Sequence, residues 1–415
     1  MLRFSNFRRR ASRRSFTSSS EEPDMTRSLR ILYIAIFLGL LLILGAWSLR
    51  SFSTFSTSAE TTVLNGKWTK AAETHYDDEF PIKRLGTNLW AALDYKLFNE
   101  GRPGVVLGKD QWLYTDEEFD AVANGEQNEA DNLALIQGVR DALEKQGTKL
   151  VLAIVPAKTR LYPEHIGDTK PASLHADLYQ QFHAQVAKAG IFAPDLLAPL
   201  QAAKQKGQVF LRTDTHWTPM GAEVAAQQLG VAIAQKTPLE GEPEQFVTQA
   251  KGSESYKGDL TTFLPLDPLF SNMLPKPDEL QQRSTDPVQG EAAGDDALFA
   301  DSDIPVGLVG TSYSANPNWN FVGALKEALR SDVVNYAEDG HGPILPMLKY
   351  LQTDAFKNTP PQVVIWEFPE RYLPAHNDLG EFDQQWIAEL KKSRNTQDNV
   401  ALNANPSESP NRAQN

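Results

Sequence analysis

Two short polar motifs in this sequence hold the residue types needed for nucleophilic catalysis. They are Asp214-Thr-His216 and, about a hundred residues later, Gly310-Thr-Ser312. An aspartate two residues before a histidine can accept a hydrogen bond from one ring nitrogen, which leaves the other nitrogen free to act as a base. Serine becomes an effective nucleophile when such a base takes its proton. The motifs therefore predict a Ser312–His216–Asp214 catalytic triad.

Each motif also has a simpler interpretation. Asp214 can cap a turn beside a surface histidine, and Gly-x-Ser after a strand is a common turn. Ser314 competes with Ser312 as the nucleophile, and His341 is an alternative base. A metal site needs a further histidine or carboxylate close by, and the sequence around His216 supplies none, so no metal is predicted.

The elements around these motifs predict a parallel α/β/α sandwich. Apolar runs at 150–156, 304–309, 333–336 and 363–366 are typical of buried strands, and 209–211 is predicted as a short strand. Helices are expected at 219–235, 321–330 and 344–352, the first opened by Thr218 as N-cap and Pro219. Ligands of such sheets lie beyond the carboxyl ends of the strands, where the serine, histidine and aspartate would converge.

The strand expected at 363–366 ends in Glu367, Glu370 and Arg371. A structural ion pair that supports the site is the favoured role for these charges, rather than direct catalysis.

The N-terminal region predicts a membrane anchor. Residues 1–30 carry eight arginines and three acidic residues, a net charge of +5 that leaves −18 on the rest of a chain whose total is −13. Residues 31–49 are uncharged and mostly apolar, and about 20 such residues span a bilayer. The run is longer than the apolar core of a cleaved signal peptide, which is the main alternative to an uncleaved anchor. The arginine excess places the N-terminus in the cytoplasm and everything after residue 50 outside.

The remaining composition sets the domain boundaries. We expect a basic cytoplasmic segment at 1–30, a signal anchor at 31–49, a Ser/Thr-rich stalk at 50–75, a catalytic domain at 76–394 and a disordered tail at 395–415. Residues 276–303 are predicted to form a long loop inside the domain. The chain has no cysteine, which excludes a disulfide framework and any cysteine-ligated metal.

Six segments of the sequence carry a resemblance to a known family. They are GRPGVVLGKDQWLY (101–114), VLAIVPAKTRLYP (151–163), DTHWTPMGA (214–222), GTSYSANPNWNF (310–321), NYAEDGHGP (335–343) and VVIWEFPERYL (363–373). With these segments, the sequence from about residue 76 to 375 resembles the alginate O-acetylation family of the AlgJ/AlgX type, whose catalytic domain is similar to a circularly permuted SGNH hydrolase. In this sequence the histidine motif precedes the serine motif, the reverse of ordinary SGNH enzymes. Too few residues follow Arg371 for the carbohydrate-binding domain of the AlgX type, so the arrangement is closer to the membrane-anchored AlgJ type.

The resemblance implies Ser312 as nucleophile, His216 as general base and Asp214 as the residue that orients it. It also implies oxyanion or substrate contacts at Asn320, Thr311, Tyr313, Arg371 and Lys158 and at the backbone N–H of Ser312. The expected protein is a single-pass inner-membrane enzyme whose periplasmic domain acetylates an exopolysaccharide. It would bind no cofactor and no nucleic acid, and would receive acetyl groups, derived from acetyl-CoA, from a membrane-bound O-acyltransferase partner.

Two other functions remain open, a carbohydrate acetyl esterase with the same triad and a non-catalytic polysaccharide-binding scaffold of a secretion complex. The polymer is also open. A charge of −18 disfavours encounter with a polyanion such as alginate unless a basic groove at Lys158, Arg160 and Arg371 offsets it, whereas a neutral glucan such as cellulose meets no such repulsion.

Overall fold

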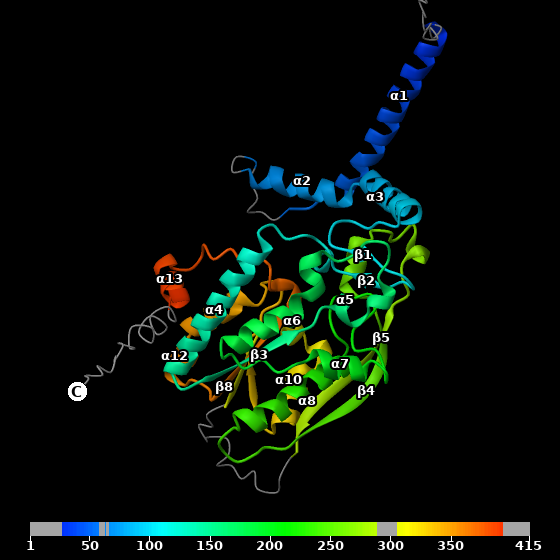
Figure 1. Ribbon diagram of the computed structural model, residues 1–415. Coiled ribbons are helices and arrows are strands. Elements are labelled where there is room, and N and C mark those ends of the chain that lie inside the picture. Colours follow the sequence, from blue (N-terminus) through cyan, green and yellow to red (C-terminus); the bar gives the residue numbers. More distant parts are fainter. Residues whose placement is uncertain (1–26, 58–62, 64–65, 289–304, 393–415) are drawn as a thin grey trace, which may run out of the picture. The chain divides into compact units, whose positions relative to one another are not determined.

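The computed structural model describes residues 27–57, 63, 66–288 and 305–392 (Figure 1). The chain divides into two compact units, residues 1–87 and 88–415. The second unit therefore begins 12 residues after the predicted start of the catalytic domain at residue 76. Three predicted segments lie wholly or mostly outside the described residues. They are the basic segment at 1–30, the part of the predicted 276–303 loop that follows residue 288, and the tail at 395–415.

The first unit contains the apolar helix that the sequence predicts. Helix α1 (Arg27–Ser48) continues into the 3-10 turn η1 (Leu49–Thr54), and together they are long and apolar enough to cross a membrane. Helix α2 (Lys67–Glu79) occupies part of the predicted stalk. His75 Nε2 lies 2.7 Å from the Ser51 carbonyl and Tyr76 donates to Ser48 Oγ at 2.9 Å, so α2 is tied to the end of α1. The predicted stalk therefore contains ordered helix.

The second unit is built on a parallel sheet, as predicted. Among the described residues the sheet has the strand order β3-β8-β6-β7, and every neighbouring pair is parallel. All positions of β6 and β8 are buried, which explains why the sequence shows continuous apolar runs instead of alternation. The bounds are β3 (Lys149–Val155), β6 (Val306–Val309), β7 (Val333–Asn335) and β8 (Val363–Pro369).

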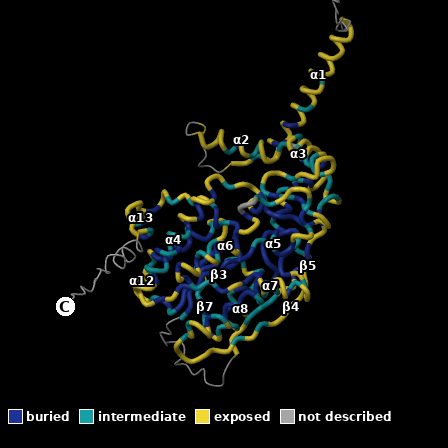
Figure 2. The backbone as a smooth tube through the Cα atoms, in the orientation of Figure 1, coloured by how far each residue is buried: buried dark blue, intermediate teal, exposed yellow. Residues whose placement is uncertain are grey.

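Helices cover both faces of this sheet and complete the three-layer architecture. The connection from β6 through α10 leads to β7, which lies on one side of β6. The connection from β7 through α11 and α12 leads back to β8, which lies on the other side of β6. Because crossovers between parallel strands are right-handed, these two opposite directions place α10 and α11 on opposite faces of the sheet. Figure 2 shows the buried backbone concentrated around β3, α6 and α8. The helices of this layer system are α4 (Gly125–Lys145), α5 (Lys158–Leu161), α6 (Ser173–Lys188), α7 (Leu197–Ala203), α8 (Pro219–Lys236), α9 (Ser312–Ala315), α10 (Phe321–Leu329), α11 (Ile344–Gln352), α12 (Asp354–Asn358) and α13 (Gln384–Lys392).

Helix α8 begins where the sequence predicts. Thr218 Oγ1 accepts a hydrogen bond from the Gly221 N–H at 3.1 Å, and Pro219 occupies the first turn. The strand predicted just before it, at 209–211, is wrong. Phe210 forms only an isolated antiparallel bridge with Trp217. Residues 209–211 are therefore a buried apolar loop and not a strand of the sheet.

A second correction concerns the predicted loop at 276–303. Residues Asp278–Pro287 form β5, which pairs antiparallel with β4 (Phe246–Tyr256) as a two-stranded ribbon. Most positions of both strands are exposed or only partly buried. A strand with little buried surface needs no apolar run, so the hydrophobic pattern gave no sign of it.

A second, smaller core lies beside the sheet in the second unit. Helix α3 (Pro81–Leu93) crosses the boundary between the units and ends in a π-helical turn, η2 (Asp94–Phe98). The short antiparallel pair β1 (Val106–Leu107) and β2 (Leu113–Tyr114) follows. The buried residues of this core are Ala92, Val105, Leu107, Leu113, Leu260, Leu264 and Leu266.

Candidate active site

The predicted serine, histidine and aspartate meet at the carboxyl edge of the sheet. Ser312 follows β6 directly, at the start of α9. Asp214 and His216 come from the buried loop between Phe210 and Trp217, which precedes α8. They therefore reach the site from a loop and not from a strand end, which corrects the predicted origin of this pair.

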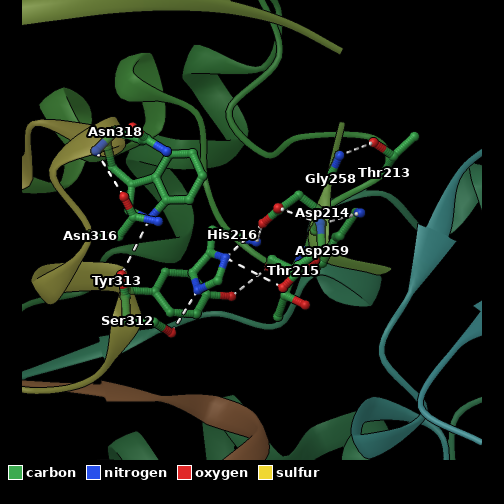
Figure 3. Close-up of polar contacts among 12 residues, drawn as sticks. Thr213, Asp214, Thr215, His216, Gly258, Asp259, Ser312, Tyr313, Asn316 and Asn318 are labelled. Carbon is green, nitrogen blue, oxygen red and sulfur yellow. Dashed lines mark hydrogen bonds and ion pairs between the residues drawn. The ribbon is translucent and has the colours of Figure 1, made fainter. Parts of the chain in front are cut away.

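The three side chains form a continuous hydrogen-bonded chain. Ser312 Oγ lies 2.7 Å from His216 Nε2, and His216 Nδ1 lies 2.6 Å from Asp214 Oδ1. Figure 3 shows the serine and the aspartate on opposite sides of the imidazole ring. A histidine that directs an Nδ1 proton at such an aspartate presents a lone pair on Nε2 to the hydroxyl, as a general base requires.

Asp214 is fully buried and kept ionised by its neighbours. Burial alone would raise the pKa of its carboxyl, but the hydrogen bond and charge of His216 and the backbone N–H groups outweigh burial and lower the pKa to about 2. The backbone N–H of His216 donates to Oδ1 at 2.9 Å. Asp259 N–H and the Tyr256 hydroxyl donate to Oδ2 at 2.8 and 3.2 Å. The carboxylate is thus fixed in orientation and charge.

The imidazole is held between aromatic rings. Trp319 stacks on His216 with ring centroids 5.2 Å apart, and Tyr313 packs at 4.7 Å. Trp319 Nε1 also donates to the Ser312 carbonyl at 3.3 Å, and the Tyr313 hydroxyl donates to the Thr215 carbonyl at 2.8 Å. These contacts fix the base and the nucleophile relative to each other.

The turn that presents Ser312 is built on a buried carboxylate. Glu367, at the carboxyl end of β8, accepts hydrogen bonds from the Thr311 N–H at 2.7 Å, the Thr311 hydroxyl at 3.0 Å and the Ser314 hydroxyl at 3.1 Å. Burial raises the pKa of Glu367 and these donors oppose that shift. Gly310 leaves the space for it, because a Cβ at that position would lie 2.4 Å from Glu367 Oε2.

We therefore expect Gly310→Ala to lower both stability and activity. The added methyl group must displace Glu367, and with it the turn that carries Ser312; overpacking of this kind costs about 1–3 kcal/mol. Urea unfolding and hydrolysis of an activated acetyl ester measure the two effects. Gly252→Ala in β4 is the matched control, because a Cβ there meets no atom within 4 Å. Equal behaviour of the two variants would contradict this account of the turn.

A second carboxylate lies beside the triad. Asp259 Oδ2 is 3.7 Å from His216 Nδ1, and Asp259 Oδ1 accepts from the Thr215 N–H at 2.8 Å. Burial and the charge of Asp214 raise the pKa of Asp259. Asp214, His216 and Asp259 are close enough to ligate a metal ion. However, both oxygens of Asp214 already accept backbone N–H groups and one bonds the imidazole, so the arrangement fits a triad better than a metal centre.

A cavity of about 270 Å³ opens onto Ser312 and His216. Its walls carry more acidic than basic groups. The lining includes Asp116, Glu117, Asp259, Asp339, Arg371, Thr311, Leu260, Phe263, Gly340, Gly342 and Tyr372.

Comparison with known proteins identifies the family to which this chain belongs. A family model described as "SGNH hydrolase-like domain, acetyltransferase AlgX" matches residues 105–370. The chain belongs to this family.

Its similarity to individual members extends over most of the chain. It is 94% identical to "Probable alginate O-acetylase AlgJ" of Pseudomonas syringae pv. tomato, over 94% of this chain and 100% of that protein. It is 56% identical to the Pseudomonas aeruginosa protein of the same name, over 92% and 99%. The solved O-acetyltransferase domain of Pseudomonas putida AlgJ is 65% identical, with a TM-score of 0.66, and the match covers 71% of this chain and 100% of that one. Pseudomonas aeruginosa AlgX is 25% identical with a TM-score of 0.51, over 66% and 68%.

Two of the further contacts that the family resemblance implied lie at the cavity. Thr311 and Arg371 both line it. Arg371, in the turn η9 (Glu370–Tyr372), pairs with Glu117 through Nε at 2.8 Å and donates to the Tyr313 hydroxyl at 3.1 Å. It is the one basic side chain among the described residues that line the cavity.

The structure places the other three implied contacts away from the cavity lining. Lys158 is buried and its ammonium donates to the carbonyls of Leu113, Arg212 and Asp214, at 2.6, 3.0 and 2.8 Å. Burial lowers the pKa of Lys158 to about 8. Its role is to tie the Asp214 loop to β2.

Asn320 and Tyr313 also lie away from the cavity lining. Asn320 donates through Nδ2 to Thr285 Oγ1 at 2.9 Å, on β5, and it precedes α10 in a left-handed conformation with φ 51°. Tyr313 is buried against His216 and positions the base.

The remaining candidates have structural roles. Glu370 and Arg371 do form structural ion pairs, but with Arg160 and Glu117 and not within the group Glu367, Glu370 and Arg371, so Arg160 and Arg371 form no open basic groove. Ser314 donates to Glu367, and His341 is exposed near Glu338.

The residues that sequence reasoning missed are Trp319, Tyr256 and Asp259. Trp319 lies in the 310–321 motif and could have been noted there, whereas Tyr256 and Asp259 come from a segment with no motif.

Proposed function

We propose that this protein transfers acetyl groups to hydroxyls of alginate on the outer side of the membrane that α1 crosses. The reaction proceeds through an acetyl ester on Ser312. The observation that carries this proposal is the hydrogen-bonded chain from Ser312 through His216 to Asp214. The choice of polymer rests on the names of relatives that match almost the whole chain.

In the first half-reaction His216 Nε2 takes the proton of Ser312 and the serine oxygen attacks the acetyl carbonyl carbon of the donor. The tetrahedral adduct collapses when the bond to the leaving group breaks, and His216 returns the proton to that group. The Ser312 N–H, at the start of α9, is the proposed donor to the oxyanion. Asp214 keeps the imidazole in the required tautomer and stabilises its charged form.

In the second half-reaction a sugar hydroxyl replaces the leaving group. His216 takes the hydroxyl proton, the sugar oxygen attacks the acetyl carbon, and the bond to Ser312 breaks as the serine oxygen recovers the proton. Acetyl-CoA is cytoplasmic, so we propose that a polytopic membrane acyltransferase delivers the acetyl group across the membrane. No cofactor is required at this site.

The acidic cavity bears on the choice of acceptor. Asp116, Glu117, Asp259 and Asp339 line it beside a single basic side chain, Arg371, which Glu117 already pairs. A polyanionic acceptor therefore presents its hydroxyl edge to Ser312, with its carboxylates outside this wall or against Arg371. Cellulose, a neutral acceptor, is the alternative that an acceptor assay separates.

The test uses the full-length protein in detergent with an activated acetyl ester as donor. We expect mass spectrometry to detect acetylated alginate oligosaccharide, with transfer exceeding hydrolysis as the acceptor concentration rises. Transfer to cello-oligosaccharide alone would change the polymer. Hydrolysis that no acceptor competes with would identify an acetyl esterase, and oligosaccharide binding without turnover would identify a scaffold.

A further inference from the structure

Helix α3 and the turn η2 expose large apolar side chains that the second unit does not cover. Trp90 and Leu97 are each 67% exposed and Phe98 is 64% exposed. Leu89 and Leu93 are also exposed. We call these five residues the apolar face of α3. Side chains of this size seldom gather on a surface that meets only water.

The opposite side of the same helix is fixed to the second unit. Asn88 Nδ2 donates to the Pro265 carbonyl at 2.6 Å, and Ala92 is buried in the second core with Ala91 and Tyr95 packed against it. The helix therefore has a buried side of small and polar contacts and an outward side of leucine and aromatic residues. It cannot rotate to bury the apolar face without giving up these contacts.

The π-helical turn extends the outward side. From Asp94 to Phe98 the backbone is wound more widely than an α-helix, and Asn99 then ends it in a left-handed conformation with φ 55°. In a regular α-helix, Phe98 would be turned well away from Leu89 and Leu93. Leu97, four residues after Leu93, would lie on the apolar face in either geometry, whereas the wider turn keeps Tyr95 on the core side and brings Phe98 toward that face. Such single π turns occur frequently at functional sites.

The occupant that these observations favour is the surface of a lipid bilayer. Only residues 55–80 separate the end of the apolar segment α1–η1 from the start of α3, so the chain tethers α3 to any membrane that α1 crosses. Tryptophan is enriched at membrane interfaces, and a helix with one apolar side lies in the plane of the headgroups. Arg84, Lys96 and Arg102 are exposed on or near this helix and suit anionic headgroups.

We propose that the apolar face of α3 lies in the boundary between the headgroups and acyl chains of the membrane that α1 crosses. It acts as a second attachment, which fixes the orientation of the catalytic unit. The small core beneath α3 contains Leu260, with Phe263 packed against it, and both residues line the catalytic cavity. The attachment would thus hold the cavity at a fixed height above the bilayer, where an acetyl group delivered through the membrane emerges.

Because the natural chain has no cysteine, single cysteines can report depth without background labelling. Leu97→Cys and Phe98→Cys carry the test, Leu41→Cys reports insertion of α1, and Lys251→Cys on the exposed strand β4 is the water-facing control. The full-length variants are spin-labelled in vesicles of phosphatidylethanolamine and phosphatidylglycerol that contain no other protein. Collision rates with oxygen and with a water-soluble nickel complex then give the depth of each label.

We expect the labels at 97 and 98 to collide more with oxygen than with nickel, the label at 41 to do so more strongly, and the label at 251 to show the reverse. Water-exposed labels at 97 and 98 beside a buried label at 41 would overturn the proposal and leave the proposed enzyme intact. Protection at 97 and 98 that appears only when a polytopic acyltransferase is added to the vesicles would also overturn it, because the face would then bind protein. A water-exposed label at 41 would refute both this proposal and the proposed anchoring.

Discussion

Ser312→Ala is expected to abolish acetyl transfer while the protein remains folded. The substitution removes the oxygen that bonds the acetyl carbon, and no other hydroxyl at the site is 2.7 Å from the base among the described residues. Loss of a triad nucleophile lowers kcat by about 10³-fold or more. The measurement is the rate of release from an activated acetyl donor, together with mass spectrometry of the protein for an acetyl adduct.

Ser314→Ala is the matched control for this prediction, two residues away. Its hydroxyl donates to Glu367, so its loss leaves a buried carboxylate with one donor fewer and should cost about 1–2 kcal/mol of stability. The acetyl adduct should still form. An adduct that persists in Ser312→Ala and disappears in Ser314→Ala would move the nucleophile to Ser314.

Asp214→Asn should lower kcat by about 10²–10⁴-fold with little change in KM, because an amide cannot hold the imidazole in the same tautomer or stabilise its charge. Asp259→Asn is the control. Its Oδ2 lies 3.7 Å from His216 Nδ1, whereas Asp214 Oδ1 lies 2.6 Å from the same nitrogen. Its effect on kcat should be much smaller. Equal losses in the two variants would mean that the carboxylates act as a pair.

Asp214→Asn should also change how the free energy of unfolding depends on pH. The pKa of Asp214 is lowered in the folded state to about 2, so the ionised carboxylate stabilises the protein above its ordinary pKa. That contribution is lost as pH falls from about 4 toward 2. Thermal unfolding across this range should therefore show a shallower loss of stability in Asp214→Asn than in the natural protein.

The elements that the sequence predicted well are those with a strong local signal. Buried strands such as β8 appear as continuous apolar runs, and Thr218 with Pro219 marks the start of α8. Helix α11 has the predicted bounds, Ile344–Gln352. The ribbon of β4 and β5 was missed because a strand without a buried side leaves no periodic pattern.

The residues of the site differ in the same way, because some have a local sequence signal and others do not. Ser312, His216 and Asp214 carry a chemical signal in their own motifs, and the structure brings them into hydrogen-bonding distance. Asp259 reaches the site only through tertiary contact, so no local pattern could place it there. Lys158 is the opposite case. Its place in a shared motif suggested a substrate contact, but its ammonium donates hydrogen bonds to three backbone carbonyls inside the protein.

The position of β8 sets the order in which this enzyme can become active. The strand is late in the chain, yet it lies between β3 and β6 in the sheet. Until residues 363–369 have emerged, β6 has no partner on that side, and Glu367 is missing from beneath the turn of Ser312. The turn that presents Ser312 therefore acquires its buried support only when this late segment has joined the sheet.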